Sequence, residues 1–189
     1  RRTLRSLLPD TISIQYAVKA NPNIDIIRQM GRFYDGLDIA SRGEMKRAME
    51  AGIPAASMNF AGPGKRLDEL EYAIRNDIGS LSIESFRELE HVRAICKRIG
   101  RITRVLIRVN PAFELYRSGV KMGGGSRQFG IDSELVPALL EQLTGDPLVR
   151  FEGIHVFAGS QNLHASAIIE SCRKMLDFAV KLSASQGVE

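Results

Sequence analysis

The sequence predicts an α/β protein whose parallel sheet is covered by helices. Short apolar segments rich in β-branched residues alternate with amphipathic segments along the whole chain, and polar residues gather where the apolar segments end. Strict alternation of strands and helices is typical of a parallel sheet, because each crossover between parallel strands needs a helix. No linker or low-complexity stretch interrupts the 189 residues, so we expect one domain.

Six segments are predicted to be strands because they are short, apolar and bounded by turn residues. The first is the clearest, since isoleucines, Tyr16 and Val18 fill it and Asn21-Pro22 then forces the chain out of regular structure. In chain order the strands are residues 12–20, 36–40, 56–61, 80–84, 104–110 and 151–158.

Six helices are predicted after these strands from apolar residues spaced three and four positions apart. In chain order the helices are residues 24–32, 43–51, 65–76, 86–99, 133–143 and 165–185. The fourth shows the spacing plainly, with one apolar face made by Leu89, Val92, Ile95, Cys96 and Ile99. Asp132-Ser133, followed by Glu134, predicts a capped and acidic start for the fifth.

Six strand–helix units leave two architectures open, an open doubly wound sheet and a (β/α)8 barrel. A complete barrel has eight units and typically about 250 residues, so these residues would form only part of one.

Composition excludes several classes of protein. Hydrophobic residues make up 44% and charged residues 25%, and no apolar run approaches the roughly 20 residues that span a bilayer. The start of the chain does not resemble a secretory signal, so we expect a cytoplasmic protein without a membrane partner. Mixed charges with a net value of +4, 6% aromatic residues and no Trp argue against nucleic-acid binding. Cys96 and Cys172 lack metal-ligand spacing, so no metal site is predicted.

Lys19 stands out because it lies at the end of the first predicted strand. In parallel α/β folds, ligands bind at the carboxyl ends of the strands. An amine that is held there, away from open solvent, is favoured in the neutral form that attacks an aldehyde. The alternative is that Lys19 only extends its ammonium group into water from the edge of the strand.

Other polar residues lie at or just after the ends of the predicted strands, the first strand included, and are predicted at the same edge as Lys19. They are Asn21, Asp38, Glu44, Lys65, Glu84, Arg108, Asn110, His155 and Ser160. Each has a plain structural alternative. Glu44 and Lys65 open helices and are consistent with a solvated face, which is the interpretation we favour for Lys65.

The other candidates have alternatives of their own. Asp38 can bond to the following turn, and Arg108 can pair with a carboxylate for packing. His155 can be a core histidine. Gly159-Ser160 can form a simple turn, or it can present N–H groups to a phosphate.

Five blocks in order resemble the fold-type III pyridoxal-phosphate (PLP) decarboxylases, the group that contains diaminopimelate, ornithine and biosynthetic arginine decarboxylases. The first block is similar to the family's cofactor-lysine motif and the last to its His-x-Gly-Ser-Gln block. The last block is also similar to that of a bacterial subgroup associated with exosortase and exopolysaccharide systems. The blocks are Tyr16-Ala17-Val18-Lys19-Ala20-Asn21, Gly36-Leu37-Asp38-Ile39-Ala40-Ser41-Arg42-Gly43-Glu44, Arg108-Val109-Asn110-Pro111, Gln128-Phe129-Gly130-Ile131 and His155-Val156-Phe157-Ala158-Gly159-Ser160-Gln161.

The resemblance implies roles for six residues. Lys19 would carry PLP through a Schiff base, His155 would stack on the cofactor ring, and Ser160 would hold its phosphate. The residues that would line or order the pocket are Asp38, Glu44 and Arg108. Two blocks depart from the family pattern: Phe157-Ala158 lengthens the one that starts at His155, and Arg127-Gln128 replaces a common Ser-Lys pair.

The resemblance also implies what residues 1–189 contain. They would be the N-terminal portion of an alanine-racemase-like (β/α)8 TIM barrel, with the last barrel strands and a C-terminal β-domain outside them. This segment alone is therefore expected to have little or no decarboxylase activity. The whole enzyme would be a homodimer acting on diaminopimelate, ornithine, lysine or arginine. A PLP racemase on the same barrel and a catalytically inactive, decarboxylase-like regulator remain as alternatives.

Overall fold

The computed structural model describes residues 2–112, 129–157, 159 and 163–186. Within these residues all strand pairs are parallel, in the order β1-β2-β3-β4-β5, and β6 and β7 each pair with β5. The strands are β1 (Gln15–Ala17), β2 (Gly36–Ile39), β3 (Met58–Phe60), β4 (Ser80–Ile83), β5 (Thr103–Asn110), β6 (Ile131–Asp132) and β7 (Val149–Val156). The helices are α1 (Arg2–Leu7), α2 (Ile24–Phe33), α3 (Arg42–Glu50), α4 (Leu67–Arg75), α5 (Phe86–Ile99), α6 (Val136–Leu143) and α7 (Ala165–Gln186).

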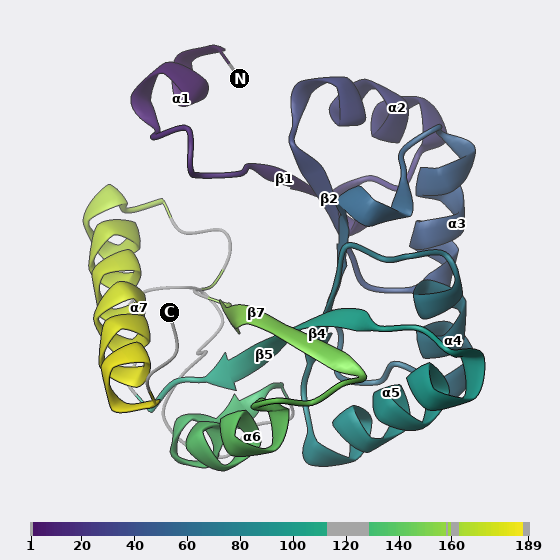
Figure 1. Cartoon of the computed structure of the whole chain (residues 1–189). Coiled ribbons are helices and arrows are strands. Elements are labelled where there is room, and N and C mark those ends of the chain that lie inside the picture. The colour runs from purple at the N-terminus through teal and green to yellow at the C-terminus, as the bar shows by residue number, and fades with distance from the viewer. Residues whose placement is uncertain (1, 113–128, 158, 160–162, 187–189) are drawn as a thin grey trace.

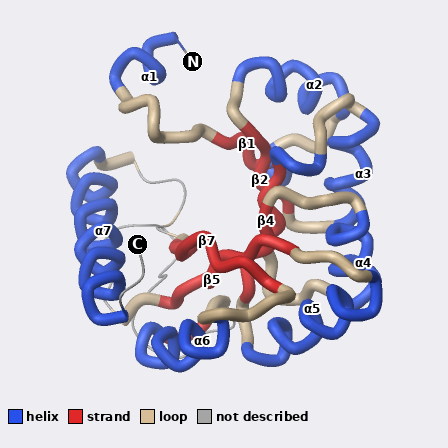
Figure 2. Tube along the Cα trace, viewed as in Figure 1, coloured by secondary structure: helices blue, strands red, loops and turns tan. Residues whose placement is uncertain are grey.

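The sheet is curved, and its helices follow the outer side of the curve. Figure 1 shows α2 to α5 in sequence around the strands, with α6 next and α7 on the opposite side of the molecule from α2 and α3. The tube in Figure 2 shows the strands gathered inside this arc of helices. Between β1 and β7 the curve stays open. The arrangement is a partial (β/α)8 barrel, which confirms the predicted fold class.

Alternation of side chains across the sheet separates an apolar face from a polar one. The apolar side chains that face the helices are fully buried: Leu37, Ile39, Met58, Phe60, Leu81, Ile83, Val105 and Ile107. Between them in sequence lie Asp38, Asn59 and Ser82, and the Asn59 side chain forms hydrogen bonds with both of the others on the inner face. The core therefore lies between sheet and helices, and the concave side is left for polar groups.

A β-bulge in β7 changes which residues face inward. Val105 pairs with Phe151 but Leu106 pairs with Gly153, so Glu152 is an extra residue. Gly153 has a φ of 146°, which L side chains rarely adopt. Beyond the bulge, Arg108 pairs with His155. A continuous register would have paired Arg108 with Ile154 instead, because one residue of slip exchanges the two faces of a strand.

Most predicted elements are confirmed, with shifts at their ends. The helix at 86–99 has the predicted bounds, since the Ser85 side chain caps its start and Gly100, with a φ of 67°, ends it. The first strand is shorter than predicted, because Val18–Ala20 forms a 3-10 turn. The predicted cap at Asp132 is wrong: its side chain accepts a hydrogen bond from Asn110 (2.7 Å) and bonds no helix N–H. Among the described residues, no helix is long and apolar enough to cross a membrane.

Candidate active site

A chain of hydrogen bonds crosses the inner face of the sheet from β2 to β7. The Asn59 amide donates to Asp38 Oδ1 (3.0 Å), and its carbonyl oxygen accepts from the Ser82 hydroxyl (3.2 Å) and from Ser80 (3.0 Å). The Ser82 oxygen in turn lies 3.0 Å from His155 Nδ1. Two predicted site residues, Asp38 and His155, are therefore linked through two residues that no motif contained.

These hydrogen bonds set the tautomer of His155. A hydroxyl carries one proton, so when Ser82 donates to Asn59 it accepts from the imidazole, and Nδ1 carries the hydrogen. Burial is the main cause that lowers the pKa of His155, and the charge of Arg108 acts in the same direction; Asp38 and Glu84 oppose it. The imidazole is thus neutral near pH 7, with Nε2 free of a proton.

Arg108 is anchored by a buried carboxylate. Its Nη1 donates to Glu84 Oε1 at 2.8 Å, and its guanidinium lies 5.0 Å from the centre of the Phe129 ring. The alternative interpretation, that Arg108 pairs with a carboxylate, therefore agrees with its contact to Glu84. Arg108 also pairs with His155 in the register of β5 and β7. Glu84 accepts two further bonds from the N–H groups of Gly62 (2.7 Å) and Gly130 (3.2 Å).

Lys65 is not the solvated residue that its place at the start of a helix suggested. Its side chain is 1% exposed, and its amine bonds to Glu88 Oε1 at 2.9 Å and to two backbone carbonyl oxygens. Burial raises the pKa of Glu88, and the nearby Lys65 ammonium acts in the opposite direction. The solvated interpretation of Lys65 was wrong because a position at the start of a helix does not show whether a long side chain extends into water or folds back into the protein.

Lys19 lies in the 3-10 turn at the carboxyl end of β1. Its side chain is exposed, contrary to the expectation that it is held away from solvent, and its amine is 5.5 Å from the centre of the Phe157 ring. Phe157 is two residues beyond His155, so the lysine and the imidazole lie at the same edge of the sheet. The geometry leaves the amine open to a carbonyl compound.

Glu44 forms hydrogen bonds at the start of α3. The carboxylate of Glu44 accepts from the N–H of Ala40 at 2.7 Å, while its own N–H bonds to the Ser41 hydroxyl (3.2 Å). Glu44 thus fixes the start of α3, and a contact with a cofactor stays a prediction. Ser160 lies outside the described residues.

Sequence reasoning left Asn59, Ser82 and Glu88 out of the predicted site. Asn59 and Ser82 are polar residues inside short apolar strands, and that contrast with their neighbours was a usable signal. Glu88 follows Ser85 by three residues, as Glu44 follows Ser41, so the pattern could only be assigned to helix capping.

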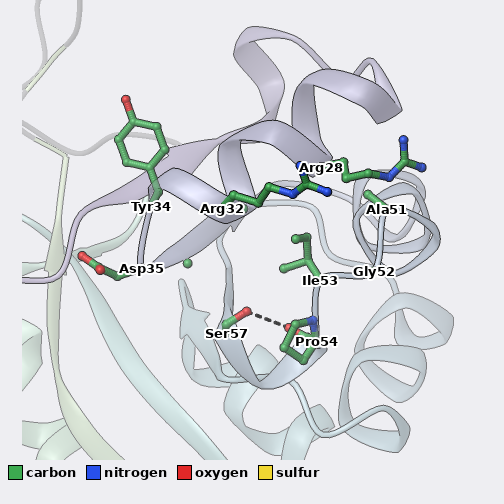
Figure 3. Close-up of a pocket in the computed structure, with 11 residues that line it drawn as sticks. Arg28, Arg32, Tyr34, Asp35, Ala51, Gly52, Ile53, Pro54 and Ser57 are labelled. Carbon is green, nitrogen blue, oxygen red and sulfur yellow. Dashed lines mark hydrogen bonds between the residues drawn. The ribbon is translucent and has the colours of Figure 1, made fainter. Parts of the chain in front are cut away.

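A separate pocket of about 480 Å³ lies at the opposite edge of the sheet. Gly36, at the start of β2, and Ser57, just before β3, line it together with Arg28 and Arg32 of α2 (Figure 3). Ser57 donates to the Pro54 carbonyl oxygen within the turn that precedes β3. The pocket shares no residue with the predicted site. In the part of the chain that the structure describes, no cluster of side chains could hold a metal ion.

Comparison with known proteins gives consistent results. Residues 1–189 match the family model described as pyridoxal-dependent decarboxylase, pyridoxal binding domain. The L-glutamyl-[BtrI acyl-carrier protein] decarboxylase of Niallia circulans is 34% identical over 99% of this chain and 44% of its own length. The diaminopimelate decarboxylase of Neisseria meningitidis serogroup A is 31% identical over 92% and 43%.

A solved structure is also similar. The diaminopimelate decarboxylase of Helicobacter pylori, as an I148L mutant in complex with L-lysine, superposes with a TM-score of 0.84 at 31% identity, over 94% of this chain and 45% of its own. The chain thus spans less than half the length of the relatives it matches. The exosortase-associated subgroup stays a prediction.

Proposed function

Because the chain belongs to the pyridoxal-dependent decarboxylases, whose pyridoxal binding domain it matches over residues 1–189, we propose that it binds PLP through Lys19 and takes part in the decarboxylation of an amino acid. The observation that carries the proposal is the juxtaposition of an exposed amine at Lys19 with the Phe157–His155 end of β7. The proposed substrates are of the diaminopimelate, ornithine, lysine or arginine type.

The residues at this edge fit a planar aldehyde. A primary amine that solvent can reach is able to bond covalently to the aldehyde carbon. The neutral, half-buried imidazole of His155 offers a flat ring for the cofactor to lie against, held by Ser82 on one nitrogen. When bound, PLP supplies an electron sink for the pair of electrons left as carbon dioxide departs.

The protein's own groups then have separate tasks. Lys19 would hold the cofactor through its amine. The bonds from Asp38 through Asn59 to Ser82 keep the imidazole of His155 in one orientation and one tautomer. Arg108, fixed by Glu84, keeps positive charge beside that imidazole and so disfavours its protonation. Ser160 is proposed to bind the phosphate.

The test uses the complete gene product. Borohydride reduction in the presence of PLP is expected to attach the cofactor irreversibly to the peptide that contains Lys19, as mass spectrometry would show. Lys19→Ala should lose the attachment and the absorbance of bound PLP, whereas Lys97→Ala, which removes an exposed lysine of α5, should keep both. A reducible PLP adduct that persists in Lys19→Ala would assign the cofactor to another lysine.

Activity separates the alternatives. Release of carbon dioxide from one of the four amino acids supports decarboxylation. Loss of optical activity without carbon dioxide would indicate a racemase, and failure of the complete protein to bind PLP would favour a regulator. We further propose a homodimer with a cytoplasmic location; light scattering of the purified protein tests the dimer.

A further inference from the structure

Four charged side chains form a buried cluster that includes Arg108 of the predicted site. Lys65 and Arg108 supply two positive charges, and Glu84 and Glu88 supply two negative ones. Their side chains are only 1–10% exposed. Taking a charge out of water costs several kcal/mol even in real proteins, so such a cluster must satisfy its charges by close contacts.

The Lys65 amine has three partners within hydrogen-bond distance. Its three N–H groups meet the Gly62 carbonyl oxygen (2.7 Å), the Ser82 carbonyl oxygen (2.8 Å) and Glu88 Oε1 (2.9 Å). The second oxygen of Glu88 accepts from the N–H of Glu84 at 2.7 Å. The Lys65–Glu88 pair therefore fixes the backbone on both sides of residue 83.

Glu84 connects this pair to Arg108. Its Oε1 is 4.0 Å from the Lys65 amine, receives the Arg108 guanidinium at 2.8 Å and receives the Gly62 N–H at 2.7 Å. Gly62 is the residue whose carbonyl oxygen Lys65 binds. Lys65 therefore acts on Glu84 directly through its charge and indirectly through the backbone of Gly62.

The cluster reaches His155 by two routes. Ser82, whose carbonyl oxygen Lys65 binds, places its hydroxyl 3.0 Å from His155 Nδ1. Arg108, held by Glu84, lies opposite His155 in the register of β5 and β7. The charged groups that act on the imidazole are Arg108, Asp38, Glu84 and Lys65.

We propose that Lys65 and Glu88 are positioning residues, whose ion pair holds Glu84, and through it Arg108, in place beside His155. Neither residue is among those proposed to contact the cofactor. The inference rests on the proposed function only in taking this edge as the PLP site, since the arrangement of the cluster itself is independent of PLP.

The decisive variant is Lys65→Met with Glu88→Gln, which removes one positive and one negative charge and leaves the net charge unchanged. Because the pair is removed together, no buried charge is left without a partner, and the fold should persist. The matched control is Arg93→Met with Asp146→Asn, which removes an ion pair of 2.6 Å between α5 and the loop after α6, away from the site.

Two measurements in the complete gene product distinguish positioning from general stability. The first is the pKa of the His155 imidazole by NMR after PLP has been removed, with the signal assigned through His155→Gln. The second is the dissociation constant of PLP by titration of its absorbance. The cluster variant should raise the imidazole pKa, because the charge of Lys65 is lost and a displaced Arg108 no longer disfavours the imidazolium, and it should weaken PLP binding about tenfold or more.

The control variant should change neither value, even where both variants lower the unfolding midpoint alike. Unchanged values in the cluster variant, or equal changes in both variants, would overturn the proposal. If the cluster variant does not fold, Glu88→Gln alone must weaken PLP binding to a smaller extent, and unchanged binding would overturn the proposal. Wild-type protein that fails to bind PLP would refute the proposed function, while the imidazole measurement would still decide this one.

Discussion

Removal of the Glu84 carboxylate should destabilise the protein far more than removal of a surface carboxylate with similar partners. In Glu84→Ala the guanidinium of Arg108 loses its counter-ion in a buried position, and two N–H groups, of Gly62 and Gly130, lose their acceptor. Breaking one side of a buried pair typically costs about 3–5 kcal/mol. With urea slopes of about 2–3 kcal/mol per molar, the unfolding midpoint should fall by about 1–2.5 M.

Two further variants separate charge from shape. Glu84→Gln keeps an acceptor oxygen in place but removes the negative charge from its hydrogen bond with Arg108. We therefore expect the free energy of unfolding to fall by about 1.5–3 kcal/mol. Adding Arg108→Met to Glu84→Gln should recover part of that loss, because the unpaired guanidinium is gone. The assay is urea unfolding followed by far-ultraviolet circular dichroism.

Glu71 provides the control, because it also bonds two arginines, Arg75 and Arg98, but on the surface. Water screens exposed ion pairs, so Glu71→Ala should lower the midpoint only slightly. The reasoning is refuted if Glu84→Ala and Glu71→Ala have the same midpoint within a few tenths of a molar, the precision that such curves give.

Three other predictions concern individual residues. The two arginines bonded to Glu71 lower its pKa from 4.5 to about 2, so its stabilising contribution should be present above pH 4.5 and lost as the pH falls toward 2; Glu71→Gln should flatten the acid limb of the unfolding midpoint against pH, and an unaltered limb would contradict this. Burial raises the pKa of the Cys96 thiol to about 11, so among the two cysteines only the exposed Cys172 should react with a thiol reagent in native protein, and Cys172→Ser should abolish the reaction; rapid labelling of Cys96 would be the opposite result. Gly79→Ala should lower the free energy of unfolding by about 1–3 kcal/mol, because a Cβ would lie 2.5–2.6 Å from two backbone oxygens. Gly64→Ala has open space around the new Cβ and should leave the free energy of unfolding unchanged; equal values for the two variants would show that the backbone at Gly79 shifts to make room.

The helices and the sheet could be predicted because their signals are local. Ser85 before Phe86 and Gly100 after Ile99 mark both ends of α5, and the apolar spacing between them fixes its buried face. The shorter β1 has another cause: it pairs with one neighbour only, over three residues, and the chain turns at Val18 before the apolar pattern ends.

The site was predictable only where a residue ends a strand. Asp38, Arg108 and His155 could be placed at one edge because parallel strands share their carboxyl ends. The burial of Lys65 depends on contacts with Gly62, which is near it in sequence, and with Ser82 and Glu88, which come from the next strand and helix along the chain. No pattern of spacing encodes these contacts.

The extra residue in β7 makes the site sensitive to length as well as to composition. Glu152 is exposed, and excision of that single codon would remove the bulge yet leave Arg108 opposite His155, whereas insertion of one residue between Gly153 and Ile154 would bring Ile154 opposite Arg108. A hydrocarbon would then occupy the place of the imidazole, and the histidine would turn toward the helices. Beyond the bulge of this strand, a single added residue is therefore a more severe change than the loss of the extra residue itself.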